Sequence, residues 1–140
     1  MAAKYFYFRK ATTAATEADE VTGSTIYPVD ALLGICSGTA ATTTGAVTDD
    51  ADAFTMFFAR KAAAPGKGGE DEAAADNVDM VIVAISTDNN QRKVIHKILN
   101  SVATSRKAVF TVFDGGAGGA EIKAHTDIEG ITIFHVETAD

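Results

Sequence analysis

One segment of this 140-residue sequence has an apolar period that an α-helix brings onto a single face. Its apolar residues recur at alternating intervals of one and three positions: Val94, Ile95, Ile98, Leu99 and Val102. At about 100° per residue these side chains share one arc of a helix, and polar residues fill the opposite arc. The polar residues are Arg92, Lys93, His96, Lys97 and Asn100. The segment therefore predicts an amphipathic helix of about four turns with a basic outer face, and Asp88 with Gln91 matches a capping box at its start.

Apolar segments flank this helix on both sides. Val78 to Ile85 is almost continuously apolar, which is typical of a strand buried on both faces, and Lys107 to Phe113 is a second such run. The sequence thus predicts a strand-helix-strand unit, whose crossover would be right-handed if the two strands were parallel neighbours. Further strands are expected at Tyr5–Lys10, at Ile26–Leu33 (an edge segment, because of Pro28), at Asp52–Lys61 and at Ile128–Val136, with short strands in the Thr-rich region after Gly34.

These elements predict an α+β fold that is mostly β-sheet, with one long amphipathic helix packed across the sheet. The length fits a single domain over residues 1–140. Residues 62–77 combine Pro65, glycines and a run of carboxylates, so we expect an exposed loop there.

The overall charge narrows the class of protein. Lysine and arginine number 12 against 19 acidic residues, which gives a net charge of −7. Such a balance argues against a protein that coats nucleic acid, because that function depends on a basic surface. No apolar run approaches the roughly 20 residues of a membrane span, and the first residues do not resemble a signal peptide. We therefore expect neither a membrane partner nor secretion by a signal peptide.

No catalytic motif is complete in the sequence. Cys36 stands at the centre of Gly34-x-Cys36-x-Gly38, which has the spacing of a nucleophile elbow, but no helix pattern follows it. We expect Cys36 to be a buried structural thiol, and a Cys36-centred enzyme is the weakest alternative. The glycines at 115–119 and the pair Gly66-Lys67 do not match dinucleotide- or phosphate-binding fingerprints. The prediction is a protein that is not an enzyme and has no cofactor.

Metal binding finds no support in the spacing of possible ligands. His96, His125 and His135 include no pair spaced to lie on one side of a helix or strand. The acidic stretches at 49–52 and 70–79 lack the alternating ligands and central glycine of a calcium loop. We expect no metal site and interpret both stretches as solvated charge.

Two segments are candidates for contact with a partner. The basic helix face, made of Arg92, Lys93, His96 and Lys97, would suit an acidic surface on a neighbouring copy or another protein. Nucleic acid is the other interpretation, which the missing aromatic residues and the negative net charge disfavour. The second segment is the aromatic strand Tyr5, Phe6, Tyr7 and Phe8, which we expect to pair with another copy to protect an exposed sheet edge.

Part of the chain resembles a known class of proteins. Val78-Asp79-Met80-Val81, the helix Gln91–Ser101, the strand Ala108–Asp114 and the terminal segment His125–Ile133 follow one another in an order that resembles small virion proteins of marine, cyanophage-like tailed phages. The resemblance covers about residues 77–136 and consists of packing patterns and a turn glycine, Gly130. It implies a non-enzymatic structural protein of the virion, of the capsid decoration or cement kind. Its partners would be copies of itself and the major capsid protein or other virion proteins.

The alternative function is a small oligomeric binding module, with RNA as one candidate ligand, that would use the basic helix face. Both functions predict a homo-oligomer, and neither requires a catalytic residue.

Overall fold

The computed structural model describes residues 4–10, 24–40, 47–59, 78–115 and 122–135. The expected loop at 62–77, the glycines at 116–119 and the Gly66-Lys67 pair lie outside these ranges. The elements in chain order are β1 (Tyr5–Arg9), β2 (Ser24–Pro28), the short 3-10 helix η1 (Val29–Ala31), β3 (Leu32–Ser37), β4 (Thr39–Ala40), β5 (Val47–Thr48), β6 (Ala53–Ala59), β7 (Val78–Ile85), α1 (Gln91–Thr104), β8 (Val109–Asp114), β9 (Ile122–Lys123) and β10 (Ile128–His135).

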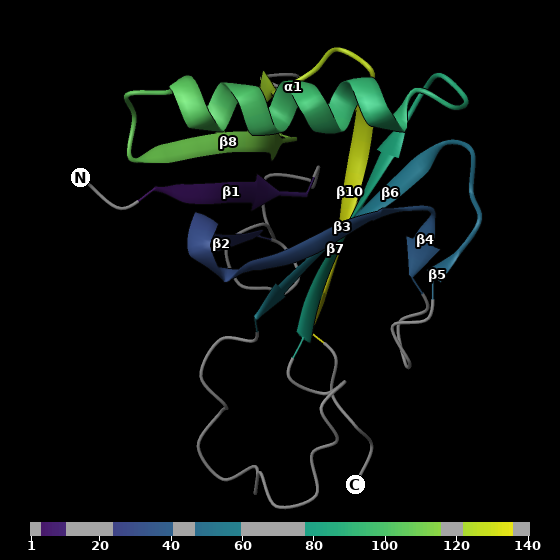
Figure 1. The fold of residues 1–140 in the computed structure, drawn as a ribbon, viewed down its shortest axis with the longest axis horizontal. Helices are drawn as coiled ribbons and strands as arrows, with labels where there is room; N and C mark the ends of the chain where they lie inside the picture. Colours follow the sequence, from purple (N-terminus) through teal and green to yellow (C-terminus); the bar gives the residue numbers. More distant parts are fainter. Residues whose placement is uncertain (1–3, 11–23, 41–46, 60–77, 116–121, 136–140) are drawn as a thin grey trace, which may run out of the picture.

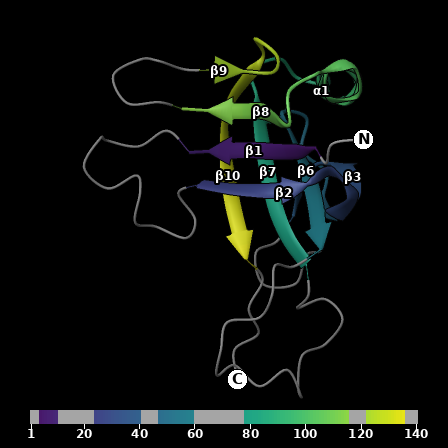
Figure 2. The same ribbon diagram turned by 90° about the vertical axis from the view of Figure 1, so that its left-hand side faces the viewer.

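Two four-stranded sheets pack face to face. Sheet A has the strand order β2-β1-β8-β9, and sheet B has the order β10-β7-β6-β3; β4 and β5 form a separate small ladder. The strands of sheet A run across those of sheet B, and α1 lies along β8 at one end of the two sheets (Figures 1 and 2). The α+β class and the single amphipathic helix of the described chain confirm the expectation from the sequence.

The chain between β7 and β8 contains the only α-helix of the described residues, but the two strands do not lie next to each other. β7 lies inside sheet B between β10 and β6, whereas β8 lies in sheet A and pairs in parallel with β1. The strand-helix-strand unit therefore connects the two sheets. The right-handed crossover expected for parallel neighbours in one sheet does not arise, because β7 and β8 belong to different sheets. The helix bridges the sheets instead of covering one sheet face.

One hydrophobic core lies between the sheets and α1. β1 contributes Phe6 and Phe8, which are fully enclosed, and Phe58 of β6 meets both rings edge-on at centroid distances of 5.8 Å. Tyr27 of β2 stacks on the same Phe58 ring at 4.3 Å. β7 points Val81, Val83 and Ile85 into this core and buries Met80 on its other face, so the expectation of a strand buried on both faces is confirmed.

The helix buries the predicted side. Val94, Ile98 and Val102 have at most 5% of their surface exposed, and Ile95 packs partly buried beside them. Leu99, at the margin of the apolar arc, remains 37% exposed. The helical period in the sequence thus identifies the packed face of α1 correctly except at its border.

The start of α1 differs from the expected capping box. The residue before the helix is Asn90, not Asp88, and no side chain caps the helix start with a hydrogen bond. Asn89 has a φ of 62°, a left-handed conformation that Asn tolerates better than most residues, and this turn places the helix start two residues later than expected. The Asn90 amide donates instead to Asp127 at 2.9 Å.

Lys4, which precedes β1, holds the other end of α1. Its Nζ donates to the carbonyl oxygens of Val102 at 2.8 Å and Ala103 at 3.2 Å. These are carbonyls of the last helical turn, where a cation also interacts favourably with the helix dipole. The start of the chain and the end of α1 are therefore joined directly.

The only helix of the described chain with more than one turn is α1, and neither its length nor its composition allows it to cross a membrane.

Candidate contact surfaces

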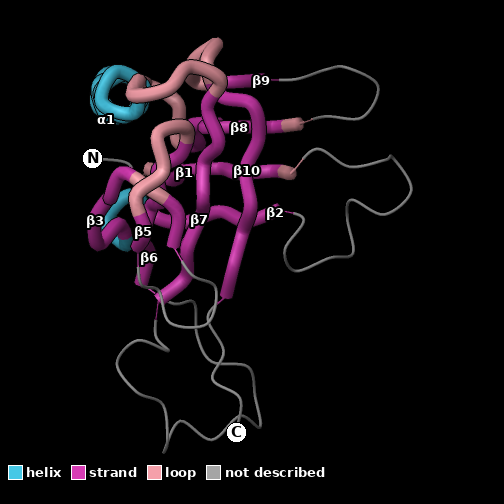
Figure 3. The backbone as a smooth tube through the Cα atoms, turned by 90° about the vertical axis from the view of Figure 1, so that its right-hand side faces the viewer, coloured by secondary structure: helices cyan, strands magenta, loops and turns pink. Residues whose placement is uncertain are grey.

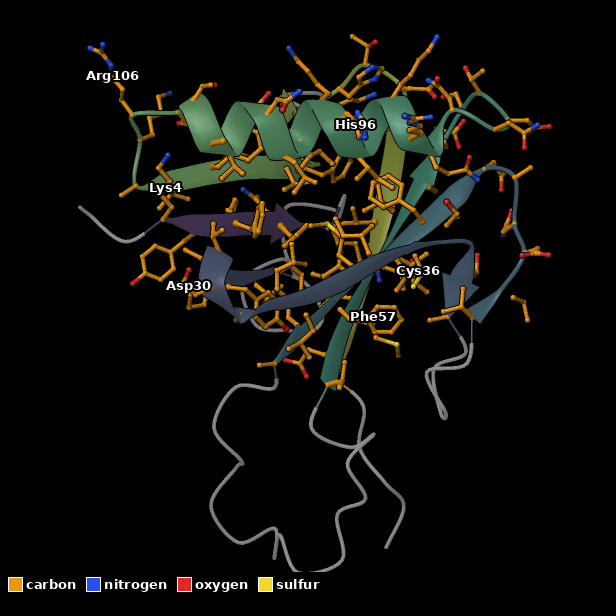
Figure 4. All side chains as sticks on the ribbon, in the orientation of Figure 1. Lys4, Asp30, Cys36, Phe57, His96 and Arg106 are labelled. Atoms are coloured by element: carbon orange, nitrogen blue, oxygen red, sulfur yellow. The ribbon has the colours of Figure 1, made fainter. Side chains whose placement is uncertain are left out.

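The basic face of α1 forms one side of a shallow hollow. The hollow has a volume of about 750 Å³, and its lining residues come from α1 and from the β9–β10 loop: Arg92, Lys93, His96, Lys97, Asn100 and His125. Figure 4 shows nitrogen-tipped side chains projecting from α1 away from the sheets. All four predicted residues of the basic helix face are thus brought together, and His125 is added to them. We call this set the basic hollow.

No carboxylate among the described residues forms an ion pair with the cations of the basic hollow. The salt bridge found in the described part joins Arg9 and Asp114, at 3.6 Å, on sheet A. Arg92 and Lys93 also lie in the first turn of α1, where the partial positive charge of the helix dipole disfavours cations. Arg92 and Lys93 are therefore placed where a cation lowers the stability of the helix, a local conflict of the kind often found at functional sites.

His125 reaches the hollow because three turns meet at the start of α1. In the β9–β10 loop the Asp127 backbone N–H donates to His125 Nδ1 at 3.0 Å, which fixes the ring. Asp127 in turn accepts from the Thr87 hydroxyl at 2.8 Å and from the Asn90 amide at 2.9 Å. These hydrogen bonds, that of Asn90 first, lower the pKa of the Asp127 carboxyl below its usual value. Asp127 thus stays ionised and ties the loop to the start of α1.

The third turn, between β5 and β6, brings carboxylates to the same place. The Gln91 side chain, which is buried, donates to the Asp50 carbonyl at 2.8 Å, and the Asn89 N–H donates to the Ala51 carbonyl at 2.7 Å. Described loops, pink in Figure 3, gather beside α1. We call residues 49–52, 86–93 and 124–127, together with His96 and Lys97, the charged end.

Carboxylates crowd one side of the charged end. Asp49, Asp50, Asp52 and Asp88 are all exposed there, and we call these four residues the acidic turns. A hydrogen bond between the two side chains lowers the pKa of Asp50 and raises that of Asp52. The negative charge of Asp50 also raises the pKa of Asp52, and Asp88 adds to this more weakly. The acidic turns therefore hold like charges close together.

The aromatic strand Tyr5–Phe8 has two faces with different roles. β1 is an interior strand of sheet A, paired on both sides by β2 and β8, so it is not an edge that needs a second copy. Phe6 and Phe8 have no exposed surface because they fill the core of this chain. This burial corrects the expectation of a partner contact for these two residues. Tyr5 and Tyr7 point to the opposite face of sheet A and are half-buried.

The outer face of sheet A carries large apolar side chains. In the strand registers of sheet A, Tyr7 lies opposite Ile26 and Tyr5 lies opposite Val109. Asp114 lies opposite Arg9 on one neighbouring strand and opposite Ile122 on the other. Residues directly opposite in a sheet share a face, so these side chains lie together on the side away from the core. Ile26, Val109 and Ile122 are 38%, 42% and 56% exposed, and no described element covers them. Figure 2 shows this face of sheet A toward the viewer.

Cys36 is exposed, which corrects the expectation of a buried thiol. It lies on β3, the edge strand of sheet B, next to Ile35, which packs against the core. β3 leads into β4 and not into a helix, so the strand-to-helix turn of a nucleophile elbow is missing here. The hollow that His96 and His125 line does not include Cys36.

The histidines and carboxylates of the described chain form no group of three that could hold a metal ion. His96 and His125, which the sequence left apart, approach the same hollow, while of His135 only the backbone, in β10, is described. The charged side chains that line the hollow beside these two histidines are cations, and a cationic hollow suits an anion and not a metal cation.

Comparison with known proteins gives no relative: no family model, curated protein or solved structure matches the chain. The candidate functions therefore depend on the two surfaces, the outer face of sheet A and the charged end.

Proposed function

We propose that this protein is a non-enzymatic structural protein of a tailed-phage virion, of the capsid decoration kind, which assembles with its neighbours through the outer face of sheet A. The observation that carries this proposal is the group of exposed apolar side chains on that face. An exposed apolar sheet face costs free energy in water, and such patches commonly mark surfaces that bind another protein.

The chemistry of the residues on the outer face of sheet A also supports a protein partner. Tyr5 and Tyr7 combine a large apolar ring with a hydroxyl, a combination enriched at protein interfaces. Ile26, Val109 and Ile122 surround them with aliphatic surface, while Arg9 and Asp114 form a polar margin. Partner copies or the major capsid protein would supply the covering surface.

Mass spectrometry of purified particles, combined with a binding assay, tests this function. The chain is expected among the virion proteins, and the double variant Ile26→Glu with Val109→Glu is expected to lose binding to particles that lack the protein. Both residues are exposed, so the substitutions leave the core intact. Leu33→Glu, at a 61% exposed position on sheet B, is the matched control and should bind normally. Absence of the chain from particles, or normal binding by the double variant, would overturn the proposal.

A binding module for RNA is the second candidate, and the basic hollow favours it. Cationic side chains that line one hollow are the expected footprint of phosphate binding. No Phe, Tyr or Trp lines this hollow to stack a base, so binding there would depend on charge alone.

A further inference from the structure

We propose that the charged end is a self-complementary interface at which two copies of this chain meet around a two-fold axis, the acidic turns of each copy entering the basic hollow of the other. This inference adds a second surface to the proposed function and does not depend on it, because it concerns the purified chain alone.

The argument starts from the distribution of charge at the start of α1. The acidic turns bring four carboxylates, Asp49, Asp50, Asp52 and Asp88, to one side of this start. The basic hollow brings Arg92, Lys93 and Lys97, with two histidines, to the other side. Figure 4 shows oxygen-tipped side chains gathered by the turns at the helix start and nitrogen-tipped ones along α1 beside them. The two patches are opposite in sign and adjacent.

Because the acidic turns and the basic hollow are adjacent and opposite in charge, two copies of the chain fit together best around a two-fold axis. A rotation of 180° about an axis between the patches places each patch against the opposite patch of the second copy, so both contacts form at once. A second copy is therefore an occupant whose charge matches the whole charged end, whereas a purely acidic ligand would meet repulsion from the acidic turns. Charge complementarity of this kind determines orientation and partner choice.

The energetics of each isolated patch favour the same occupant. Asp50 and Asp52 interact unfavourably when both are ionised, as the raised pKa of Asp52 shows. Arg92 and Lys93 stand at the positive end of the helix dipole without an acidic residue in the first turn. Opposite charge from a second copy relieves both kinds of repulsion. The net charge of −7 opposes association at long range, but its effect is screened beyond about 10 Å at 0.1 M salt.

The charged end is also built to hold its shape before a partner arrives. The Gln91, Asn90 and Thr87 side chains hydrogen-bond to the β5–β6 turn or to Asp127, so the three turns are fixed to one another. The side chains of Asp49, Asp88, Lys93 and Lys97 are exposed and lie outside this hydrogen-bonded framework. Because the backbone of these turns is already fixed, binding restricts the charged side chains but orders no further loop.

Charge reversal on either patch tests the interface. The variant Lys93→Glu with Lys97→Glu gives the basic hollow a net negative charge, and Asp49→Lys with Asp88→Lys cancels the negative charge of the acidic turns. We expect each double variant alone to self-associate at least about tenfold more weakly than the wild type, a factor equal to about 1.4 kcal/mol. An equimolar mixture should associate again, because the unchanged acidic turns of the first variant then face the unchanged basic hollow of the second. At the other contact the introduced glutamates of the first variant face the introduced lysines of the second.

Sedimentation equilibrium of the purified full-length chains, with one variant carrying a fluorescent label, measures these effects at low and at high salt. Arg106→Glu with Lys107→Glu, at exposed positions after the far end of α1, is the matched control and should associate like the wild type. A wild-type chain that is monomeric at low salt, unchanged association of the double variants, or a mixture that does not recover would each overturn the inference. So would binding of a single-stranded RNA oligonucleotide by a monomeric wild type, lost on Lys93→Glu with Lys97→Glu, because the hollow would then serve a nucleic acid. Particle binding, tested separately through sheet A, is unaffected by this outcome.

Discussion

The space between the two sheets and the charged end place carboxylates in opposite surroundings. Between the sheets Asp79 is 1% exposed, and its Oδ2 accepts a hydrogen bond of 2.7 Å from the Tyr27 hydroxyl. At the charged end Asp50 and Asp52 are exposed and share a hydrogen bond with each other. In the first region a buried hydroxyl donates to a buried carboxyl group, and in the second charge of both signs faces outward.

The difference shows how one short helix serves both folding and contact. The inner side of α1 supplies Val94, Ile98 and Val102 to the core, where burial gives most of the stability of the helix. The outer side supplies the cations of the basic hollow, which contribute little to folding because they are exposed. Substitutions on the two sides should therefore separate stability from association.

The largest effect is expected from a charge on the inner side of α1. Ile98→Asp places an unpaired carboxylate at a position with no exposed surface, which costs several kcal/mol of a total stability of about 5–15 kcal/mol. Lys97→Asp, one residue away on the outer side, should change stability by less than about 0.5 kcal/mol. Urea unfolding of both variants measures the contrast. Equal losses would show that the two sides of α1 do not differ as described.

The next effect concerns the carboxylate between the sheets. Tyr27→Phe keeps the stacking on Phe58 but removes the hydroxyl that donates to Asp79, and it should destabilise the chain by about 1–3 kcal/mol. Tyr5→Phe, on the outer face of sheet A, is the control and should cost far less.

Burial and the Asp79 hydrogen bond also raise the pKa of Tyr27 above 10. A raised pKa in the folded state means that this stability is present below about pH 10 and is lost as the pH rises further. The alkaline limb of the urea midpoint against pH should therefore be shallower in Tyr27→Phe. An identical alkaline limb would contradict the contribution of Tyr27.

A smaller effect is expected where the start of the chain meets α1. Lys4→Met removes the cation that donates to the carbonyls of Val102 and Ala103, and it should lower stability by about 1 kcal/mol. Lys107→Met, exposed and just beyond α1, should have almost no effect. Thermal unfolding followed by circular dichroism distinguishes the two, and equal Tm values would show that Lys4 does not support the helix end.

The smallest effect is a change in acid sensitivity at the charged end. The lowered pKa of Asp127 means that its contribution is present above the ordinary pKa of about 4 and disappears as the pH falls through the lower folded value. Asp127→Asn should therefore be slightly less stable at pH 7 and lose less stability than the wild type on acidification to pH 3. Tm values across this range provide the test, and parallel curves would contradict the assigned hydrogen bonds.

The elements with a clear local period were predictable, because burial imposes that period on the sequence. The packed side of α1, the doubly buried β7 and the aromatic strand β6 follow directly from residues 94–102, 78–85 and 53–59. The parallel pairing of β1 with β8 joins segments about 100 residues apart, and no local pattern records such a partner. Phe6 and Phe8 were assigned to a partner for the same reason, since an aromatic strand looks the same at an edge and in the interior.

Only the part of the charged end that lies on α1 could be predicted from the sequence. Arg92, Lys93, His96 and Lys97 share a helix face by spacing alone, whereas His125 joins them through a loop held by Asp127. The capping-box pattern predicts Asp88 as the residue before the helix, whereas the structure has Asn90 there. The difference arises because Asn89 adopts a left-handed conformation, which the pattern does not reveal. Cys36 was expected inside because free cysteines are usually buried, but the alternation of β3 turns it outward.

The most direct test of the central claim measures folding and association on the same sample of the variant Lys93→Glu with Lys97→Glu. The claim is that the outer side of α1 serves contact and the inner side serves folding. We expect the urea midpoint of the variant to be no lower than that of the wild type, because Lys93→Glu exchanges a cation for an anion at the positive end of the helix dipole, while sedimentation equilibrium shows weaker self-association. A midpoint that falls as far as that of Ile98→Asp, or self-association equal to that of the wild type, would contradict the claim.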